Sequence, residues 1–155
     1  MAAQSKGTIL ITGANGGLGS AMAKHISSTP EMAAYHGLYA VRDATRADAL
    51  RAALDPAHQH SHDILSMDLT NLASVRQTAS DITSRIKRGD IPPIKTLILN
   101  AGFQDFGHQT WTDSGLDTTF SANYLGHWLL TVLLLGSMDK ESGSRIVVVG
   151  SQSHE

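Results

Sequence analysis

A cluster of glycines directly after a short apolar run is the feature of this sequence most suited to chemistry. The apolar run covers residues 8–11, and the segment after it reads Thr12-Gly13-Ala14-Asn15-Gly16-Gly17-Leu18-Gly19. Glycines between a strand and a helix let bare backbone approach a pyrophosphate, whose charge is then held by N–H groups at the helix N-terminus. The segment therefore predicts a phosphate-binding turn, although its spacing is not G-x-G-x-x-G. Its candidate cofactor-binding residues are Gly13, Asn15, Gly16, Gly17, Leu18 and Gly19.

The rest of the chain alternates between short apolar runs and helical patterns, which is the arrangement needed to position such a turn. Apolar or β-branched runs at 7–12, 37–42, 62–67, 95–100 and 144–150 predict strands, and patterns at 17–28, 44–54, 71–88 and 113–135 predict helices. Asn71 is a candidate N-cap for the third helix, and Gly89 ends it. Strictly alternating elements predict an α/β fold, doubly wound in the Rossmann manner, with a parallel sheet of about five strands in the order 3-2-1-4-5. We expect residues 1–155 to form one domain.

Five segments in this order resemble the short-chain dehydrogenase/reductase family. The first is the Thr-Gly-x-x-x-Gly-x-Gly turn itself. The other four each follow, approach or form a predicted strand, and they are the segments 67–69, 100–102, 120–127 and 145–151. The segment 123–127 and the pair Arg42-Asp43 are most similar to the retinol-dehydrogenase-like and fungal branch of the family. The resemblance implies cofactor-binding roles for Asp68 and Leu69, where the carboxylate meets the adenine amino group, and for Asn100, Ala101 and Gly102. It implies catalytic roles for Asn123, which organises a water-mediated proton path, and for Ser151, which polarises the carbonyl.

The end of the second predicted strand bears on the choice of cofactor. NAD-selective relatives carry an acid at this position to bind the ribose diol, whereas this chain has Val41 followed by Arg42. A guanidinium can pair with a 2′-phosphate, so the sequence favours NADP(H) over NAD(H). Two alternatives remain open: Arg42 is an ordinary surface charge while Asp43 binds the ribose, and Asp68 only caps the following helix.

One part of the family pattern has no counterpart in the printed sequence. The resemblance implies a tyrosine as general acid/base and a lysine four residues later that lowers its pKa, and this is a physical requirement because an unperturbed tyrosine titrates near pH 10. The residues four positions after Tyr35, Tyr39 and Tyr124 are tyrosine, aspartate and tryptophan. Since only four residues follow Ser151, we expect a truncated, incomplete domain that lacks the last strands and is inactive alone.

Two functional hypotheses therefore stay open. The chain is the cofactor-binding portion of an NADP(H)-dependent oxidoreductase that interconverts carbonyls and secondary alcohols, or it is a naturally short, non-catalytic module that binds a nucleotide or a protein. In either case the predicted helix 113–135 exposes an apolar stripe, which makes a homo-oligomer possible. The stripe contains Trp128, Leu129, Val132 and Leu133.

The composition of the chain also bears on other classes of function and on its location. The net charge of −2 gives no basic excess for nucleic acid, and no apolar stretch reaches the roughly 20 residues of a membrane span. The absence of cysteine and of a secretion signal is compatible with a cytoplasmic location. The alternating His58, His60 and His62 could place two imidazoles on one strand face, but without a third ligand we expect a solvated loop and no metal site.

Overall fold

A five-stranded parallel sheet forms the centre of the molecule. The computed structural model describes residues 5–54 and 60–151. The strand order is β3-β2-β1-β4-β5, and every neighbouring pair is parallel. The predicted doubly wound fold and its 3-2-1-4-5 order are therefore confirmed. The strands are β1 (Thr8–Thr12), β2 (His36–Val41), β3 (His62–Ser66), β4 (Ile94–Leu99) and β5 (Arg145–Val148).

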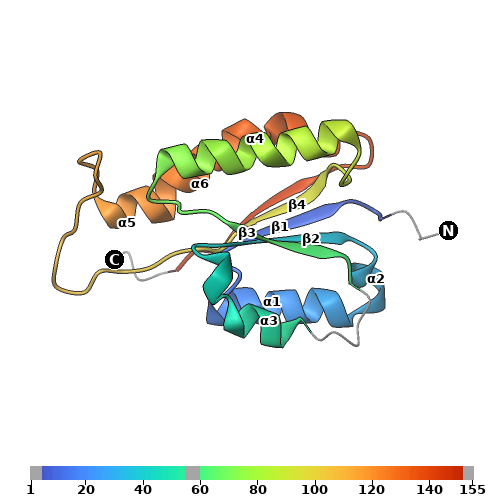
Figure 1. Ribbon diagram of the computed structural model, residues 1–155, viewed down its shortest axis with the longest axis horizontal. Coiled ribbons are helices and arrows are strands. Elements are labelled where there is room, and N and C mark those ends of the chain that lie inside the picture. The colour runs from blue at the N-terminus through green and yellow to red at the C-terminus, as the bar shows by residue number, and fades with distance from the viewer. Residues whose placement is uncertain (1–4, 55–59, 152–155) are drawn as a thin grey trace.

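Helices cover both faces of the sheet, as Figure 1 shows. The helices α1 (Gly17–Ser28), α2 (Pro30–Ala33) and α3 (Asp48–Ala53) lie on one side, and α4 (Leu72–Arg88) and α6 (Gly126–Leu134) lie on the other. Two buried clusters result, one around Tyr39 and Leu50 and one around Leu10 and Leu97. β1 and β2 are buried at every position because each of them has helices on both faces.

The helix α4 follows its predicted range closely because its end signals are strong. The Asn71 side chain accepts hydrogen bonds from the N–H groups of Ala73 and Ser74, and Gly89 ends the helix with a positive φ of 79°. These are an N-cap that satisfies two free donors and a C-terminal residue in the left-handed region. The predicted strands also agree with the observed ones to within one or two residues at each end, and the largest difference is the end of β5 at Val148.

Two predicted helices are shorter or more irregular than expected. The pattern at 44–54 divides into a 3₁₀ turn, η1 (Ala44–Arg46), and α3, because the Asp43 side chain caps the turn at Thr45. The pattern at 113–135 begins as a helix only at α5 (Thr118–Phe120), where Asp117 caps it. It continues through a π-helical turn, η2 (Ser121–Leu125), into α6 and a 3₁₀ turn, η3 (Leu135–Ser137).

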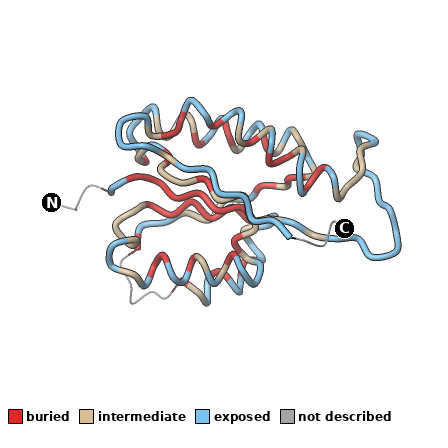
Figure 2. The backbone as a smooth tube through the Cα atoms, turned by 180° about the vertical axis from the view of Figure 1, so that it is seen from behind, coloured by how far each residue is buried: buried red, intermediate tan, exposed pale blue. Residues whose placement is uncertain are grey.

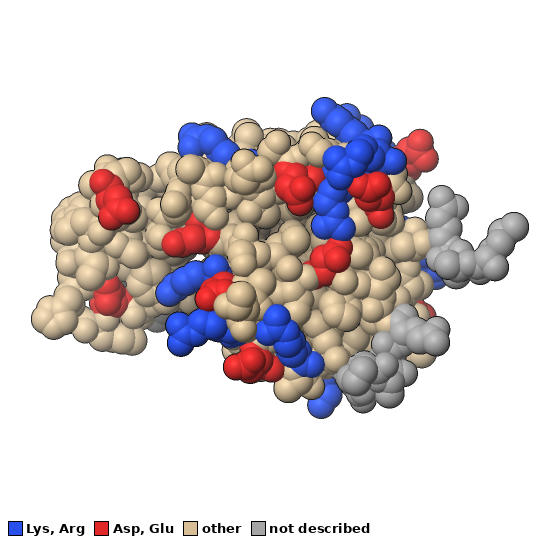
Figure 3. Space-filling model, viewed as in Figure 1, with Lys and Arg blue, Asp and Glu red and all other residues tan. Residues whose placement is uncertain are grey.

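β5 differs from the inner strands in its exposure. It ends the order of the described strands, and all four of its residues are exposed; Figure 2 shows it pale blue beside the red inner strands. On the face drawn in Figure 3, lysine and arginine side chains are interspersed with acidic ones. No helix in the described part of the chain is long and apolar enough to cross a bilayer.

Candidate cofactor site

A cavity of about 420 Å³ lies at the carboxyl ends of the strands, where the ends of β1, β2, β3 and β4 meet. This is the edge at which open α/β sheets bind ligands. The cavity brings together eleven of the residues that the sequence singled out. They are Gly13, Gly16, Gly17, Leu18, Gly19, Arg42, Asp68, Leu69, Asn100, Ala101 and Gly102.

The glycines of the turn differ in what a side chain at each position would meet. Gly13 has a φ of 65°, and a Cβ there would come within 2.7 Å of the Cα of Ala101. A Cβ on Gly19 would collide with the carbonyl oxygen of Gly13, so this glycine allows α1 to pack against the turn. A Cβ on Gly17 would meet nothing within 4 Å. Gly17 therefore leaves open space at the cavity, at the first residue of α1.

Thr12 and Asn100 hold the carboxyl ends of β1 and β4 together. The Asn100 side-chain amide donates to the carbonyl of Thr12 at 3.0 Å and to that of Gly13 at 3.3 Å. The Thr12 hydroxyl accepts from the backbone N–H groups of Asn100 and Ala101, both at 3.0 Å. Thr12, Gly13, Asn100 and Ala101 all line the cavity, so these hydrogen bonds fix the glycine turn against the Asn100-Ala101-Gly102 segment.

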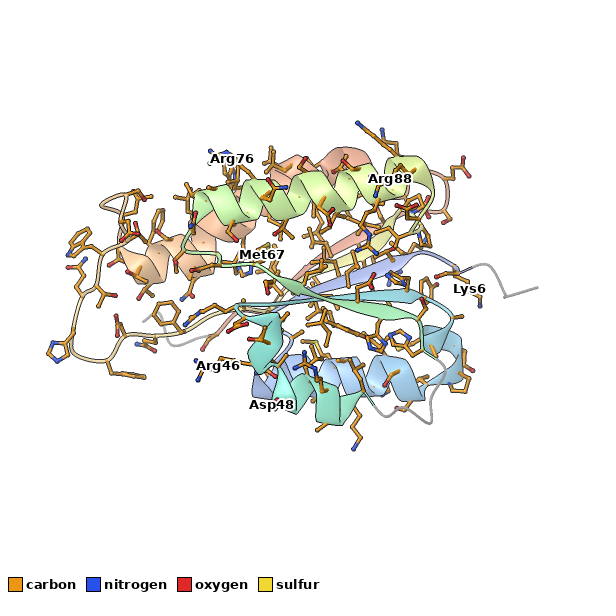
Figure 4. All side chains as sticks on the ribbon, in the orientation of Figure 1. Lys6, Arg46, Asp48, Met67, Arg76 and Arg88 are labelled. Atoms are coloured by element: carbon orange, nitrogen blue, oxygen red, sulfur yellow. The ribbon has the colours of Figure 1, made fainter. Side chains whose placement is uncertain are left out.

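A second cavity of about 400 Å³ adjoins the first beyond the end of β2 and shares Gly13, Gly16, Val41 and Arg42 with it. Arg42 and Arg46 both line it, so this side of the site carries two guanidinium groups. Arg46 was not among the predicted residues, although the sequence shows it four residues after Arg42, near the start of the second predicted helix. Figure 4 shows Arg46 and Met67 at the same end of the sheet.

Asn15 and Asp43 line the second cavity but are engaged with the protein. The Asn15 side chain accepts from the N–H of Leu50 at 3.0 Å and donates to the carbonyl of Arg46 at 3.4 Å, so it ties the glycine turn to α3. Asp43 Oδ1 accepts from the N–H and the hydroxyl of Thr45. The bond from the Thr45 hydroxyl is the main reason that the pKa of Asp43 is lowered.

Asp68 lines the main cavity and also shapes its own loop. Its Oδ1 accepts from the N–H and the hydroxyl of Thr70, while Asn71 performs the capping of α4. The alternative that Asp68 merely caps the helix is therefore wrong. The neighbouring Leu69 is buried, and a Cβ on Gly126 would collide with its carbonyl oxygen. The start of α6 is thus pressed against this wall of the cavity.

The two predicted catalytic residues lie outside the set that lines the cavities. Asn123, in the π-helical turn, uses its side chain to hold Phe103: its Oδ1 accepts from the Phe103 N–H at 3.0 Å and its Nδ2 donates to the Phe103 carbonyl at 2.8 Å. Phe103 and Ala122 line the main cavity, so Asn123 stands immediately beside it. Ser151 is exposed and lies beyond the carboxyl end of β5.

His127 is buried beside the cavity and was not among the predicted site residues. Its Nε2 is 2.8 Å from the Thr12 hydroxyl, and its Nδ1 is 3.2 Å from the carbonyl oxygen of Asn123. Burial is the main cause that lowers the pKa of His127, so the ring is neutral near pH 7. The spacing of four residues from Asn123 places both on one helix face, which was the available signal.

The expectation that the histidine-rich segment is a solvated loop is wrong for His60, whereas His62 begins β3 and is exposed. His60 is buried, with its Nε2 2.8 Å from the Tyr39 hydroxyl, and its ring stacks on that of His62. Burial lowers the pKa of His60 and raises that of Tyr39. Within residues 5–54 and 60–151, no three metal-ligating side chains gather into a metal site. His58 lies outside the described residues.

Comparisons with known proteins agree with this architecture. The family model described as short chain dehydrogenase matches residues 7–155. A short-chain dehydrogenase of Talaromyces variabilis is 49% identical over 154 residues, which is 97% of this chain and 42% of the relative. Human retinol dehydrogenase 13 is 36% identical over 152 residues, which is 95% of this chain and 42% of that protein.

A solved structure gives the same result. The short-chain dehydrogenase from Sphingobium yanoikuyae in complex with NADPH superimposes with a TM-score of 0.73 at 26% identity, covering 94% of this chain and 54% of that one. The chain spans less than half the length of the two relatives above. The match of the family model over nearly all residues, on a sheet of the expected order, shows that this chain belongs to the short-chain dehydrogenase family.

Proposed function

We propose that this chain is the cofactor-binding portion of an NADP(H)-dependent oxidoreductase that interconverts carbonyls and secondary alcohols. The observation that carries the proposal is the cavity at the carboxyl ends of the strands, where eleven candidate residues from four strand ends meet. A bound nicotinamide would supply or accept the hydride. The protein groups bind and orient it, and they present polar atoms next to the reacting carbon.

Each wall of the cavity suits one part of a dinucleotide. Gly16, Gly17 and the N-terminus of α1 suit the pyrophosphate, because a helix N-terminus presents free N–H groups and the backbone there carries no side chain. Asp68 and Leu69 suit the adenine. Ala101 and Gly102 leave room for the ribose on the nicotinamide side.

The preference for NADP(H) rests on the charge of the adjoining cavity. Arg42 and Arg46 both line it, and the neutral Val41 takes the place of a carboxylate that would repel a 2′-phosphate. Asp43 already accepts two hydrogen bonds from Thr45 on one oxygen. This engagement supports the role of Arg42 over the alternative in which Asp43 binds the ribose diol. The complex of the Sphingobium yanoikuyae relative with NADPH also supports the choice of this cofactor.

Asn123 and Ser151 are the two residues to which the proposal gives roles toward the substrate. Ser151, beyond β5, would polarise a carbonyl, and Asn123 would organise water for proton transfer. The Asn123 side chain also bonds to the backbone of Phe103, which fixes its position beside the cavity.

Calorimetric titration of the chain with NADPH and with NADH tests the proposal. We expect NADPH to bind more tightly by about 1.5–3 kcal/mol, the range for charge-assisted hydrogen bonds. Absence of binding by either nucleotide would contradict the cofactor assignment, and equal affinities would contradict the preference. Because a general base and its lysine are not found in the printed sequence, we expect no turnover of ketones or alcohols by these 155 residues.

A further inference from the structure

A closed circuit of hydrogen bonds surrounds the floor of the cavity. It runs from the Thr12 hydroxyl to the N–H of Ala101, along the backbone to Phe103, across to the Asn123 side chain, and from the Asn123 carbonyl through His127 back to Thr12. We call these five residues the Thr12–His127 circuit. It joins the glycine turn, the segment after β4 and the π-helical turn, which are remote from one another in sequence.

The protonation of the circuit follows from counting donors and acceptors. A hydroxyl has one hydrogen and two acceptor sites. The Thr12 hydroxyl already accepts from the N–H groups of Asn100 and Ala101, so its hydrogen is directed at His127 Nε2. The proton of the neutral ring is then on Nδ1, which donates to the Asn123 carbonyl.

We propose that His127 is a positioning residue that sets the place of Asn123, and through it of Phe103, relative to the glycine turn. The inference rests on the proposed function in so far as Asn123 and the cavity serve a cofactor and substrate. His127 is not itself one of the residues that line the cavity, and it acts through its bonds to Thr12, which lines the cavity, and to the Asn123 carbonyl. The π-helical turn makes this support necessary, because its wider hydrogen-bonding pattern departs from the regular helix just where Asn123 lies.

Two variants separate this role from simple packing. His127→Phe keeps a buried aromatic ring but removes both hydrogen bonds. His127→Asn retains an amide donor near the position of Nδ1 and so preserves the bond to the Asn123 carbonyl. Both variants are compared with the parent chain without cofactor and with NADPH.

The first measurement is ¹⁵N NMR of the cofactor-free parent at pH 7. We expect a neutral His127 with its proton on Nδ1. A charged ring, or a proton on Nε2, would overturn the proposal, and this result does not depend on whether any variant folds.

The second measurement is amide hydrogen exchange at Phe103, with Leu38 in β2 as the reference for global stability. In His127→Phe we expect exchange at Phe103 to accelerate by about 3- to 10-fold, which corresponds to the loss of one hydrogen bond, while Leu38 is unchanged. His127→Asn, which keeps the bond to the Asn123 carbonyl but loses the one to Thr12, should restore the parent rate at Phe103 only in part. Equal rates in all three proteins, or equal acceleration at Leu38, would show that His127 only packs.

The third measurement is NADPH affinity, which we expect to fall by about 3- to 10-fold in His127→Phe and to recover only in part in His127→Asn. If His127→Phe binds NADPH as tightly as the parent does while its Phe103 amide exchanges faster, the circuit does not serve the site and the proposal fails. If the parent itself binds no nucleotide, the proposed function fails, whereas the positioning of Asn123 is still decided by NMR and exchange.

Discussion

Asn100 reaches from the end of β4 to the end of β1 and donates its side-chain amide to the carbonyl of Thr12 at 3.0 Å. The same amide reaches the Gly13 carbonyl at 3.3 Å, so one side chain satisfies two acceptors where the backbone leaves the sheet. A strand pair that ends in a turn has no further ladder bonds to offer these carbonyls. The contact therefore substitutes for the sheet at the point where the cavity begins.

Replacing this amide by an isosteric carboxylate should destabilise the fold. In Asn100→Asp, an acceptor faces two carbonyl oxygens, and we expect the free energy of unfolding to fall by about 1–3 kcal/mol, the penalty for buried unsatisfied polar groups. Urea denaturation followed by circular dichroism measures it. Asn71→Asp is the matched control, because a carboxylate caps a helix as well as an amide does. Equal losses in the two variants would contradict the role of Asn100.

The glycine turn predicts a contrast between two neighbouring glycines. In Gly19→Ala the new Cβ meets the backbone of Gly13 and Ala14, which cannot move aside cheaply, so we expect a loss of stability of about 1–3 kcal/mol. In Gly17→Ala the Cβ meets no protein atom, so the fold should be as stable as the parent or slightly more stable. On the proposed function, Gly17→Ala should nevertheless bind NADPH more weakly. Thermal unfolding and titration of both variants distinguish these outcomes, and a stable Gly19→Ala would contradict the packing argument.

The sequence predicted the sheet and the cavity well because their signals are local. An apolar run, a glycine or polar residue at its end and a helical repeat fix each unit, and the parallel order follows from the alternation. The helix predicted at 113–135 was placed too early at its start, because apolar periodicity does not reveal where a helix begins. Asp117, whose side chain caps α5, was the better marker of that start.

The contacts between distant residues were beyond sequence reasoning. Nothing in the residues near His127 shows that Thr12, 115 positions earlier, supplies its hydrogen-bond partner. His60 was misjudged for the same reason, since its burial depends on Tyr39 of the neighbouring strand. Burial of a polar side chain is decided by tertiary packing, and the residue types next to His60 in the sequence give no information on it.

The cofactor preference predicts a selective effect of the two arginines. Arg42→Ala should weaken NADPH binding by about 10- to 100-fold, because a charge-assisted pair with the 2′-phosphate is lost, and should leave NADH binding nearly unchanged. Arg46→Ala should act in the same direction, since Arg46 lines the same cavity. Arg76→Ala, on α4 and labelled in Figure 4, is the control for a general change of charge. A similar loss for NADPH and NADH in Arg42→Ala would contradict the assignment.

Three buried histidines predict a loss of stability in mild acid. Burial lowers the pKa of His36, His60 and His127, whereas in the unfolded chain each titrates near 6.5. The unfolded state therefore binds more protons as the pH falls below about 6.5, and the free energy of unfolding decreases from there until the lowered pKa values are passed. Asp63 and Asp139 have lowered pKa values, so their contribution is lost only at more acidic pH.

Urea unfolding at pH 7.5 and pH 5.5 measures this effect. We expect a clear decrease at the lower pH in the parent and a smaller decrease in His60→Gln, which cannot take up the proton. His25→Gln is the control, because His25 is exposed on α1. A decrease of the same size in the parent and His60→Gln would show that burial of His60 does not contribute.

The exposed edge of the sheet predicts self-association of these 155 residues. β5 ends the order of the described strands, and Val148 is 71% exposed and Trp128 on α6 is 54% exposed. The predicted stripe on α6 is thus partly confirmed as exposed, but Leu129 packs against the core and is not part of it.

A strand edge with free N–H and C=O groups and β-branched side chains is a template for a second copy, and antiparallel pairing keeps the two Arg145 side chains apart. We expect sedimentation velocity to show dimers at high concentration, and Val148→Asp to shift the population towards monomer. Gln77→Glu, at an exposed position of α4, is the control for an added negative charge, and a strictly monomeric parent would contradict the prediction.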